Sequence, residues 1–140
     1  MGVKMRERKG TVRYLTFGLL TLLFTISMAF TAFGGQYEDA TAAYKRGDFA
    51  TAFRIFKALA EQGDASAQVN LALMFDAGEG VPQDYILAHM WFNLAVSALE
   101  GKKQEQTVKD RDNVASKMTS AQIAEAEQLA KEWKPKKEGK

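Results

Sequence analysis

The chain of 140 residues contains no cysteine, one histidine (His89) and two prolines (Pro82 and Pro135). Without cysteine it can form neither a disulfide nor a thiolate metal site, and it has no thiol nucleophile. A zinc site would need carboxylates almost alone around one imidazole, which is an unusual ligand set. We therefore expect no metal and no cofactor. We expect His89 to be an ordinary surface or half-buried helical residue.

The sequence also lacks a sustained alternation of apolar and polar residues, which is the pattern of half-buried β-strands. After residue 36 the chain is rich in alanine, leucine, glutamate, glutamine and lysine, all of which favour helix. Apolar residues make up 46% and charged residues 26%, an ordinary balance for a single globular domain. These features predict an all-α fold.

The globular part lacks an excess of positive charge. Residues 1–13 hold five basic residues and one acidic residue, which leaves 14 basic and 16 acidic residues for the rest of the chain. A surface that binds nucleic acid needs a surplus of Lys and Arg to displace counterions from the phosphates. Nucleic acid is therefore not an expected partner.

Only one hydrophobic run is long, and it follows the basic stretch. Residues 14–33 carry no charge, and small residues near their end suit cleavage before Phe30 or before Gly35. This order is typical of a secretory signal, so we expect residues 1–34 to be a signal peptide and the remainder to be periplasmic or secreted. Alternatively, residues 14–33 stay in the inner membrane as an anchor, because about 20 apolar residues can cross a bilayer. Both alternatives export the C-terminal part.

Two stretches after the hydrophobic run resemble each other. Asp48 and Asp84 lie 36 residues apart, and each is followed by an aromatic residue, an alanine and a phenylalanine at the same spacing. The residues before them match at an offset of 31, which assigns the second unit a longer internal loop at residues 79–83. A repeat of this length predicts helical hairpins stacked in a tetratricopeptide-like solenoid.

Aspartate and threonine mark where the expected helices begin. Asp48, Asp64 and Asp84 stand where an N-cap belongs, and Thr119 with Gln122 fits a capping box. Between these positions, apolar residues recur at the spacing of one helix face. The pattern predicts helices at residues 37–46, 49–62, 65–77, 84–100, 104–117 and 120–133.

The second unit carries a motif of apolar, glycine and aromatic residues at fixed spacing. Its positions are Leu71, Phe75, Gly78, Gly80, Asp84, Ala88 and Trp91. The motif resembles the Sel-one-like repeat of exported bacterial proteins, a tetratricopeptide-related pair of antiparallel helices, although this family usually has glycine at Ala72 and tyrosine at Phe75. The resemblance implies a short α-solenoid with packing roles for the motif residues. It implies two repeats in residues 36–101, C-terminal capping helices in 102–134 and a flexible basic tail in 135–140.

The resemblance also implies a function. Sel-one-like proteins act as adaptors that assemble other proteins, and the family has no shared catalytic residues. We expect a non-catalytic scaffold of the cell envelope that binds an unidentified protein or peptide on its concave face, built from the first helix of each hairpin. Positions that the motif leaves unused on that face are the candidate contacts: Ser66, Asn70, Leu73 and Asp76, with Asp39, Ala42 and Lys45 as counterparts in the first hairpin.

Two alternative functions are weighed against the adaptor. A membrane-anchored structural subunit of an envelope complex would retain residues 14–33. An envelope hydrolase would need a nucleophile and a base, and neither a Gly-x-Ser-x-Gly turn nor a phosphate loop is present in the sequence. We therefore expect no catalytic residue. Since two repeats are fewer than a stable array usually needs, the C-terminal helices complete the stack or the protein dimerises.

Overall fold

The computed structural model describes residues 35–137, and all regular secondary structure in this part of the chain is helical, as the sequence predicts. Residues 35–45 are helical. The helices that follow are α2 (Phe49–Glu61), α3 (Ala65–Ala77), α4 (Tyr85–Ala98), α5 (Gly101–Ala115) and α6 (Ser120–Glu132). None of the described helices is long and apolar enough to span a membrane. The predicted signal peptide or anchor lies outside the described residues.

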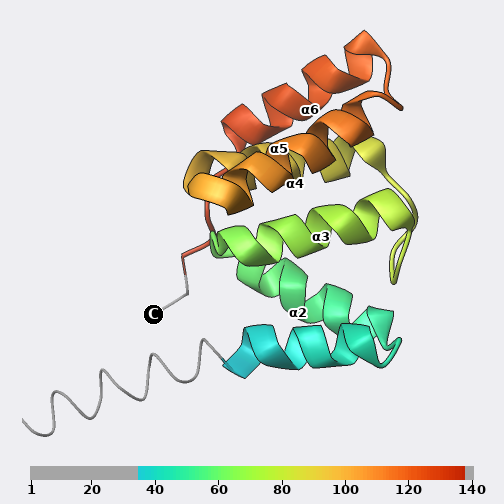
Figure 1. Ribbon diagram of the computed structural model, residues 1–140, viewed down its shortest axis with the longest axis vertical. Helices are drawn as coiled ribbons and strands as arrows, with labels where there is room; N and C mark the ends of the chain where they lie inside the picture. The colour runs from blue at the N-terminus through green and yellow to red at the C-terminus, as the bar shows by residue number, and fades with distance from the viewer. Residues whose placement is uncertain (1–34, 138–140) are drawn as a thin grey trace, which may run out of the picture. The chain divides into compact units, whose positions relative to one another are not determined.

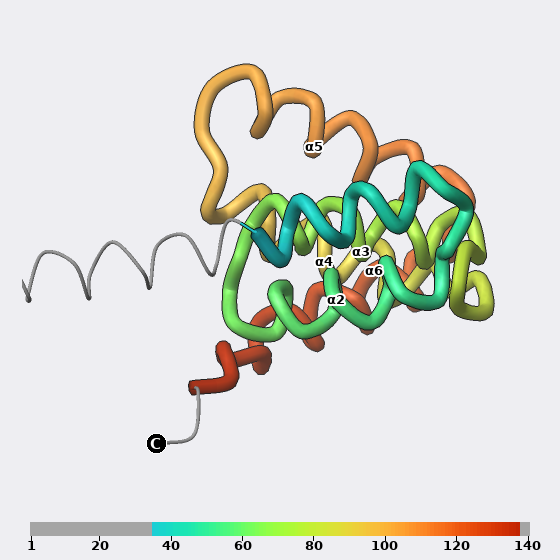
Figure 2. The backbone as a smooth tube through the Cα atoms, turned by 90° about the horizontal axis from the view of Figure 1, so that it is seen from below, coloured from blue at the N-terminus to red at the C-terminus, as the bar shows by residue number. Residues whose placement is uncertain are grey.

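The helices of the described domain stack in antiparallel pairs (Figure 1). Helix α3 packs against α2 and α4, and α4 also contacts α5 and α6. Seen along the stack, residues 35–45 and α5 lie on one side, while α2 and α6 lie on the other (Figure 2). The first helices of the successive pairs therefore share one face of the domain, which we call the first-helix face.

Side-chain caps fix the helix starts where the sequence places them. The carboxylates of Asp48, Asp64 and Asp84 accept hydrogen bonds from the main-chain N–H groups three residues later, at 3.2, 2.7 and 2.9 Å. Each bond satisfies one of the N–H groups that a helix start leaves without a partner. The capping box of Thr119 and Gln122 is formed at the start of α6.

The core is made where alanines of one helix meet large side chains of the next. Ala52, Ala67 and Ala88 are fully buried, and so are Phe56 and Phe92. Small side chains let helix axes approach closely, and the large ones fill the space between layers. Four residues of the sequence motif belong to this core, since Leu71, Phe75, Ala88 and Trp91 are all buried.

The loop between α3 and α4 requires glycine at two points. Gly78 ends α3 in the left-handed region, with φ +70°. Gly80 has φ +72°, and a Cβ atom built on it would lie 2.4 Å from the carbonyl oxygen of Phe49. Only a residue without a side chain allows this loop to lie against the start of α2.

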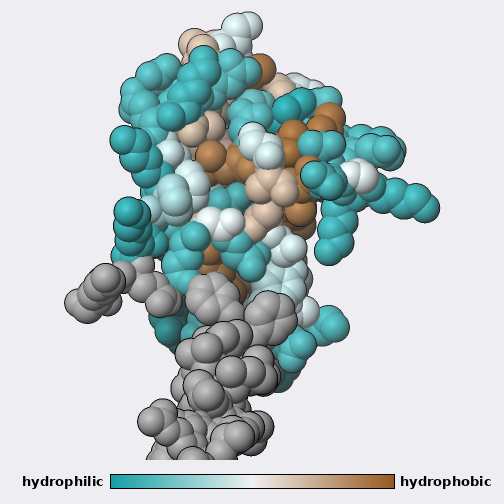
Figure 3. Space-filling model, turned by 90° about the vertical axis from the view of Figure 1, so that its left-hand side faces the viewer, coloured by the Kyte–Doolittle hydropathy of each residue, from teal (hydrophilic) through white to brown (hydrophobic). Residues whose placement is uncertain are grey.

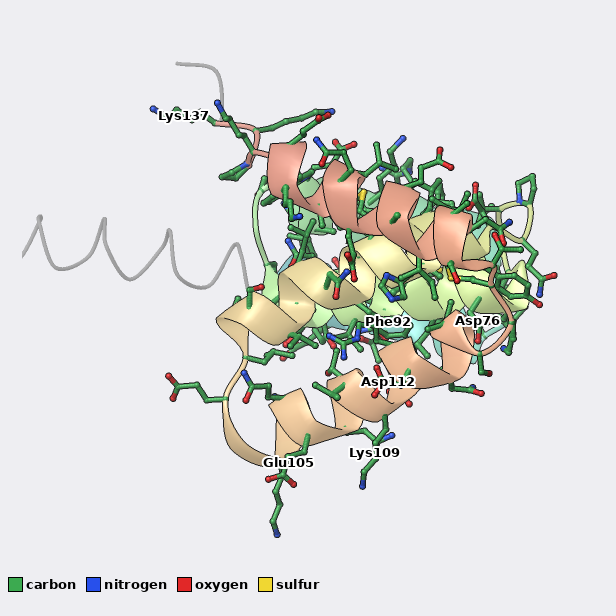
Figure 4. All side chains as sticks on the ribbon, turned by 90° about the horizontal axis from the view of Figure 1, so that it is seen from above. Asp76, Phe92, Glu105, Lys109, Asp112 and Lys137 are labelled. Atoms are coloured by element: carbon green, nitrogen blue, oxygen red, sulfur yellow. The ribbon has the colours of Figure 1, made fainter. Side chains whose placement is uncertain are left out.

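Helices α5 and α6 both pack on α4 but diverge from each other. They scarcely touch each other, whereas each of them packs against α4. Helix α5 is polar, and only Thr107 and Val114 of its residues are buried. Glu105 and Lys109 point from α5 away from α4 (Figure 4).

The segment after α6 crosses to the first repeat. Trp133 stacks edge-on against Trp91 of α4, with ring centroids 5.9 Å apart. The main-chain N–H of Lys136 donates to the carbonyl oxygen of Glu61 at 2.8 Å, and its ammonium group pairs with the Glu61 carboxylate at 2.8 Å. We call residues 133–137 the C-terminal strap. The sequence placed Trp133 in the last helix and predicted a flexible tail in residues 135–140, and it did not predict the contacts of Lys136.

Candidate functional site

The first-helix face contains a hollow of about 210 Å³. It is bordered by residues 35–45, by α3, by α5 and by Leu99, which directly follows the end of α4. Its lining residues are Tyr37, Ser66, Val69, Asn70, Leu99, Lys103, Gln106, Thr107 and Asp110. We call this hollow the first-helix groove. The end of the domain at which it lies shows mostly hydrophilic side chains with a smaller band of hydrophobic ones (Figure 3).

Hydrogen bonds hold the polar side chains of the groove in place. The Nδ2 group of Asn70 donates to the hydroxyl oxygen of Tyr37 at 2.8 Å and to the carbonyl oxygen of Ser66 at 2.9 Å. Across the groove, Gln106 donates from Nε2 to Oδ1 of Asp110 at 2.9 Å. Asn70 thereby joins the first pair of helices to the second, and its orientation is set before any partner arrives.

The four candidate contacts of the sequence analysis separate into two groups. Ser66 and Asn70 line the first-helix groove. Leu73 is 40% exposed on the same helix, outside the residues that line the groove. The carboxylate of Asp76 pairs with the ammonium group of Lys117 at 2.8 Å. Asp39, Ala42 and Lys45 are exposed and do not line the groove.

Asp76 belongs to a contact at the opposite end of α3. Its carbonyl oxygen accepts a hydrogen bond from Nε2 of Gln83 at 2.6 Å. The ammonium group of Lys117 lies 5.3 Å from the ring centroid of Tyr85, and its hydrogen bond to Asp76 raises the pKa of Lys117. Asp76 thus connects α3, the α3–α4 loop and the turn before α6, which is a structural task.

Sequence reasoning missed the part of the groove that α5 supplies. Lys103, Gln106, Thr107 and Asp110 come from a helix that was assigned only to capping. Their mixed charge gave no signal, because charged residues on a helix usually face solvent. The i, i+3, i+4 spacing of the lining positions on α5 was a usable signal once α5 was placed beside α3.

The two repeats of the chain match a known family. Residues 35–64 and residues 65–98 each match the family model of the Sel1 repeat. This chain contains two Sel1 repeats. Such repeats generally mediate interactions between proteins and are typically non-catalytic. No curated protein and no solved structure matches the chain significantly.

The protein has a second hollow where α5 and α6 diverge. It measures about 410 Å³, and α4 forms its floor. Its lining residues are Asn93, Leu94, Val96, Ser97, Arg111, Glu127, Ala130 and Lys131. Figure 4 shows this end of the stack from above, with α4 visible between the two upper helices.

His89 is only 3% exposed and lies beside Asn93, one of the residues that line that second hollow. The expectation of a surface or half-buried residue was wrong, because the sequence did not show that α5 and α6 both cover α4. Its Nδ1 atom lies 3.2 Å from Nδ2 of Asn93, whose Oδ1 accepts from Arg111 at 3.3 Å. Burial, and then the charge of Arg111, lower the pKa of His89.

The described residues offer no arrangement for metal chemistry. Within residues 35–137, no group of three or more His, Asp or Glu side chains is placed to hold a metal ion. The Nδ1 atom of His89 lies at hydrogen-bond distance from Asn93, and the side chain is buried. What these residues can offer a partner is the first-helix groove, with its fixed polar groups and its apolar Val69 and Leu99.

Proposed function

We propose that this protein is a non-catalytic adaptor of the cell envelope that binds a segment of another protein in the first-helix groove. The observation that carries the proposal is the arrangement of Tyr37, Asn70 and α5 around one hollow. The motif side chains are used in the core, so recognition falls to the residues between them. Interfaces commonly combine an apolar centre with oriented polar groups at the rim, as this groove does.

Photo-crosslinking in cells tests the groove. A benzophenone amino acid at Gln106, on the rim, should capture a specific partner, and Asn70→Ala should reduce the yield. The same amino acid at Lys57, an exposed residue of α2, serves as the matched control. Equal capture from both positions, or capture indifferent to Asn70→Ala, would remove the groove from the proposal.

Leu73 and Asp76 provide an internal comparison for the same experiment. If the partner extends along α3 beyond the groove, Leu73→Asp should also lower capture. Asp76→Ala should not, because this carboxylate is engaged by Lys117. A loss with Asp76→Ala and none with Asn70→Ala would place binding at the other end of the helix.

We further propose that the domain acts after export, supported by the basic and then apolar order of residues 1–33. N-terminal sequencing of the protein recovered from the envelope distinguishes the two fates of this segment. A mature chain that starts at Phe30 or Gly35 indicates cleavage and a soluble adaptor. A chain that retains residues 14–33 indicates a membrane-anchored subunit, and recovery from the cytoplasm alone would refute export.

A further inference from the structure

The hydrogen bonds of Asn70 leave a defined acceptor in the first-helix groove. The carbonyl oxygen of Ser66 can only accept, so the atom that faces it must be Nδ2. The second hydrogen of Nδ2 goes to the hydroxyl oxygen of Tyr37. Both hydrogen bonds of the Asn70 side chain thus use Nδ2. The Oδ1 atom accepts none from residues 35–137 and is available to a ligand.

Tyr37 provides a donor beside that acceptor. Its hydroxyl oxygen already accepts from Asn70, so its own hydrogen is not needed for that bond. The groove thus presents an acceptor and a donor, held next to each other by one hydrogen bond. A main-chain peptide unit carries the complementary pair, one N–H donor and one C=O acceptor.

These two groups select the conformation of the ligand. In a helix the main-chain N–H and C=O groups are bonded within the helix itself, so a helical ligand has none to offer along its length. An extended segment exposes both, and its main chain supplies affinity while pockets read its side chains. The groups of Asn70 and Tyr37 therefore fit an extended segment.

The size and walls of the groove limit the side chain that enters it. Its volume of about 210 Å³ is below the range of roughly 300–1,000 Å³ that is usual for drug-sized ligands. Val69 and Leu99 supply the apolar part of the lining. The space suits one apolar side chain better than a charged one.

The charge at the rim selects the neighbouring residue. Lys103 makes no ion pair with another residue of the described range, whereas Asp110 is already bonded by Gln106. Lys103 also lies in the first turn of α5, at the positive end of the helix dipole; this turn itself contains no acidic residue and follows the N-cap Glu100. An acidic side chain of the ligand is the group that this position favours.

We infer that the partner enters the first-helix groove as an extended segment, with one apolar residue such as leucine in the hollow and an acidic residue beside Lys103. The Oδ1 atom of Asn70 accepts a hydrogen bond from a main-chain N–H group of the segment, and the hydroxyl group of Tyr37 donates one to a main-chain carbonyl oxygen of the segment. This inference rests on the proposed function and adds the chemical class of the partner. It assigns binding roles to Tyr37 and Lys103, which the motif analysis did not single out.

The test is a titration of the isotope-labelled full chain, kept soluble in a mild detergent, with the peptide acetyl-Ser-Leu-Glu-amide followed by NMR. We expect chemical-shift changes at the side-chain amide of Asn70 and at the main chain of Lys103. Three altered peptides leave the protein untouched: N-methyl leucine removes the main-chain donor, lysine replaces the glutamate, and aspartate replaces the leucine. Each should bind about three- to tenfold more weakly, as expected for the loss of one interaction of this kind.

The matched protein variant is Tyr37→Phe, which removes only the hydroxyl group and should weaken binding of the parent peptide by a similar factor. Lys57→Gln on α2 is the control and should leave binding unchanged. The inference is overturned if no peptide causes shifts in the groove, or if the N-methylated peptide binds as well as the parent. If crosslinking from Gln106 still captures a partner in that case, the adaptor function stands and only the extended-segment assignment fails.

Discussion

At the scale of single residues, Gly80 carries the sharpest steric demand among the glycines of residues 35–137. A methyl group there would meet the carbonyl of Phe49 at 2.4 Å, and the residue would also keep a φ of +72°. We expect Gly80→Ala to lower the free energy of unfolding by about 2–4 kcal/mol, from overpacking together with backbone strain. Urea denaturation followed by circular dichroism measures the loss.

Gly47 is the matched control for that experiment. Its φ is +79°, but nothing lies within 4 Å of the position of a Cβ atom. Gly47→Ala should therefore show backbone strain alone, about 1 kcal/mol. Equal losses for the two variants would mean that the α3–α4 loop does not press against α2 in solution.

His89 makes the stability of the domain depend on pH. Burial and Arg111 lower its pKa in the folded state and outweigh Glu127 and Asp112, which raise it. The unfolded chain therefore takes up the proton first, near the ordinary pKa of about 6.5. The contribution of His89 to the free energy of unfolding should be constant above that pH and should fall as the pH drops below it. His89→Gln should flatten this fall in urea denaturation between neutral and mildly acidic pH, and an unchanged slope would contradict the assignment.

At the scale of helices and their ends, the sequence predicted the features that depend on residues close together in the chain. Asp84 caps α4 and Gly78 ends α3 as predicted, because a cap or a left-handed turn depends on residues a few positions away. The bond between Tyr37 and Asn70 spans 33 residues, so it depends on how two helices are packed. The start of α5 was misplaced by three residues, since Glu100 provides no side-chain cap to mark it.

The C-terminal strap has two kinds of contact that should differ in strength. The ion pair of Lys136 and Glu61 is largely exposed on the lysine side. Glu61→Gln should therefore cost less than about 1 kcal/mol. Trp133→Ala removes a half-buried ring stacked on Trp91, and we expect a loss of about 2 kcal/mol. Circular dichroism in urea compares the two variants, and a larger loss for Glu61→Gln would reverse this ranking.

At the scale of the whole described domain, α4 is the helix that joins the second repeat to the C-terminal helices. It contacts α3, α5 and α6, and its buried residues include His89, Met90, Trp91 and Phe92. The prediction of an all-α stack was confirmed because repeat spacing and glycine positions encode it. The role of α5 in the groove was not predicted, because a polar helix outside the repeat motif gives no sign of its neighbours.

A chain that ends after Ala98 tests how far two repeats suffice. Removing α5, α6 and the strap exposes the buried side of α4 to water. We expect this chain to lose most of its cooperative unfolding transition, measured by circular dichroism during heating. A sharp transition close to that of the full chain would show that the two repeats fold without the C-terminal helices.

The C-terminal strap fastens the last layer of helices to the first. Because Lys136 is bonded to the end of α2, the layers cannot fan apart on that side without breaking its two contacts with Glu61. We expect these contacts to restrain the distance between residues 35–45 and α5 before any ligand binds. A ligand meets a groove of fixed width, so less ordering is left to oppose binding.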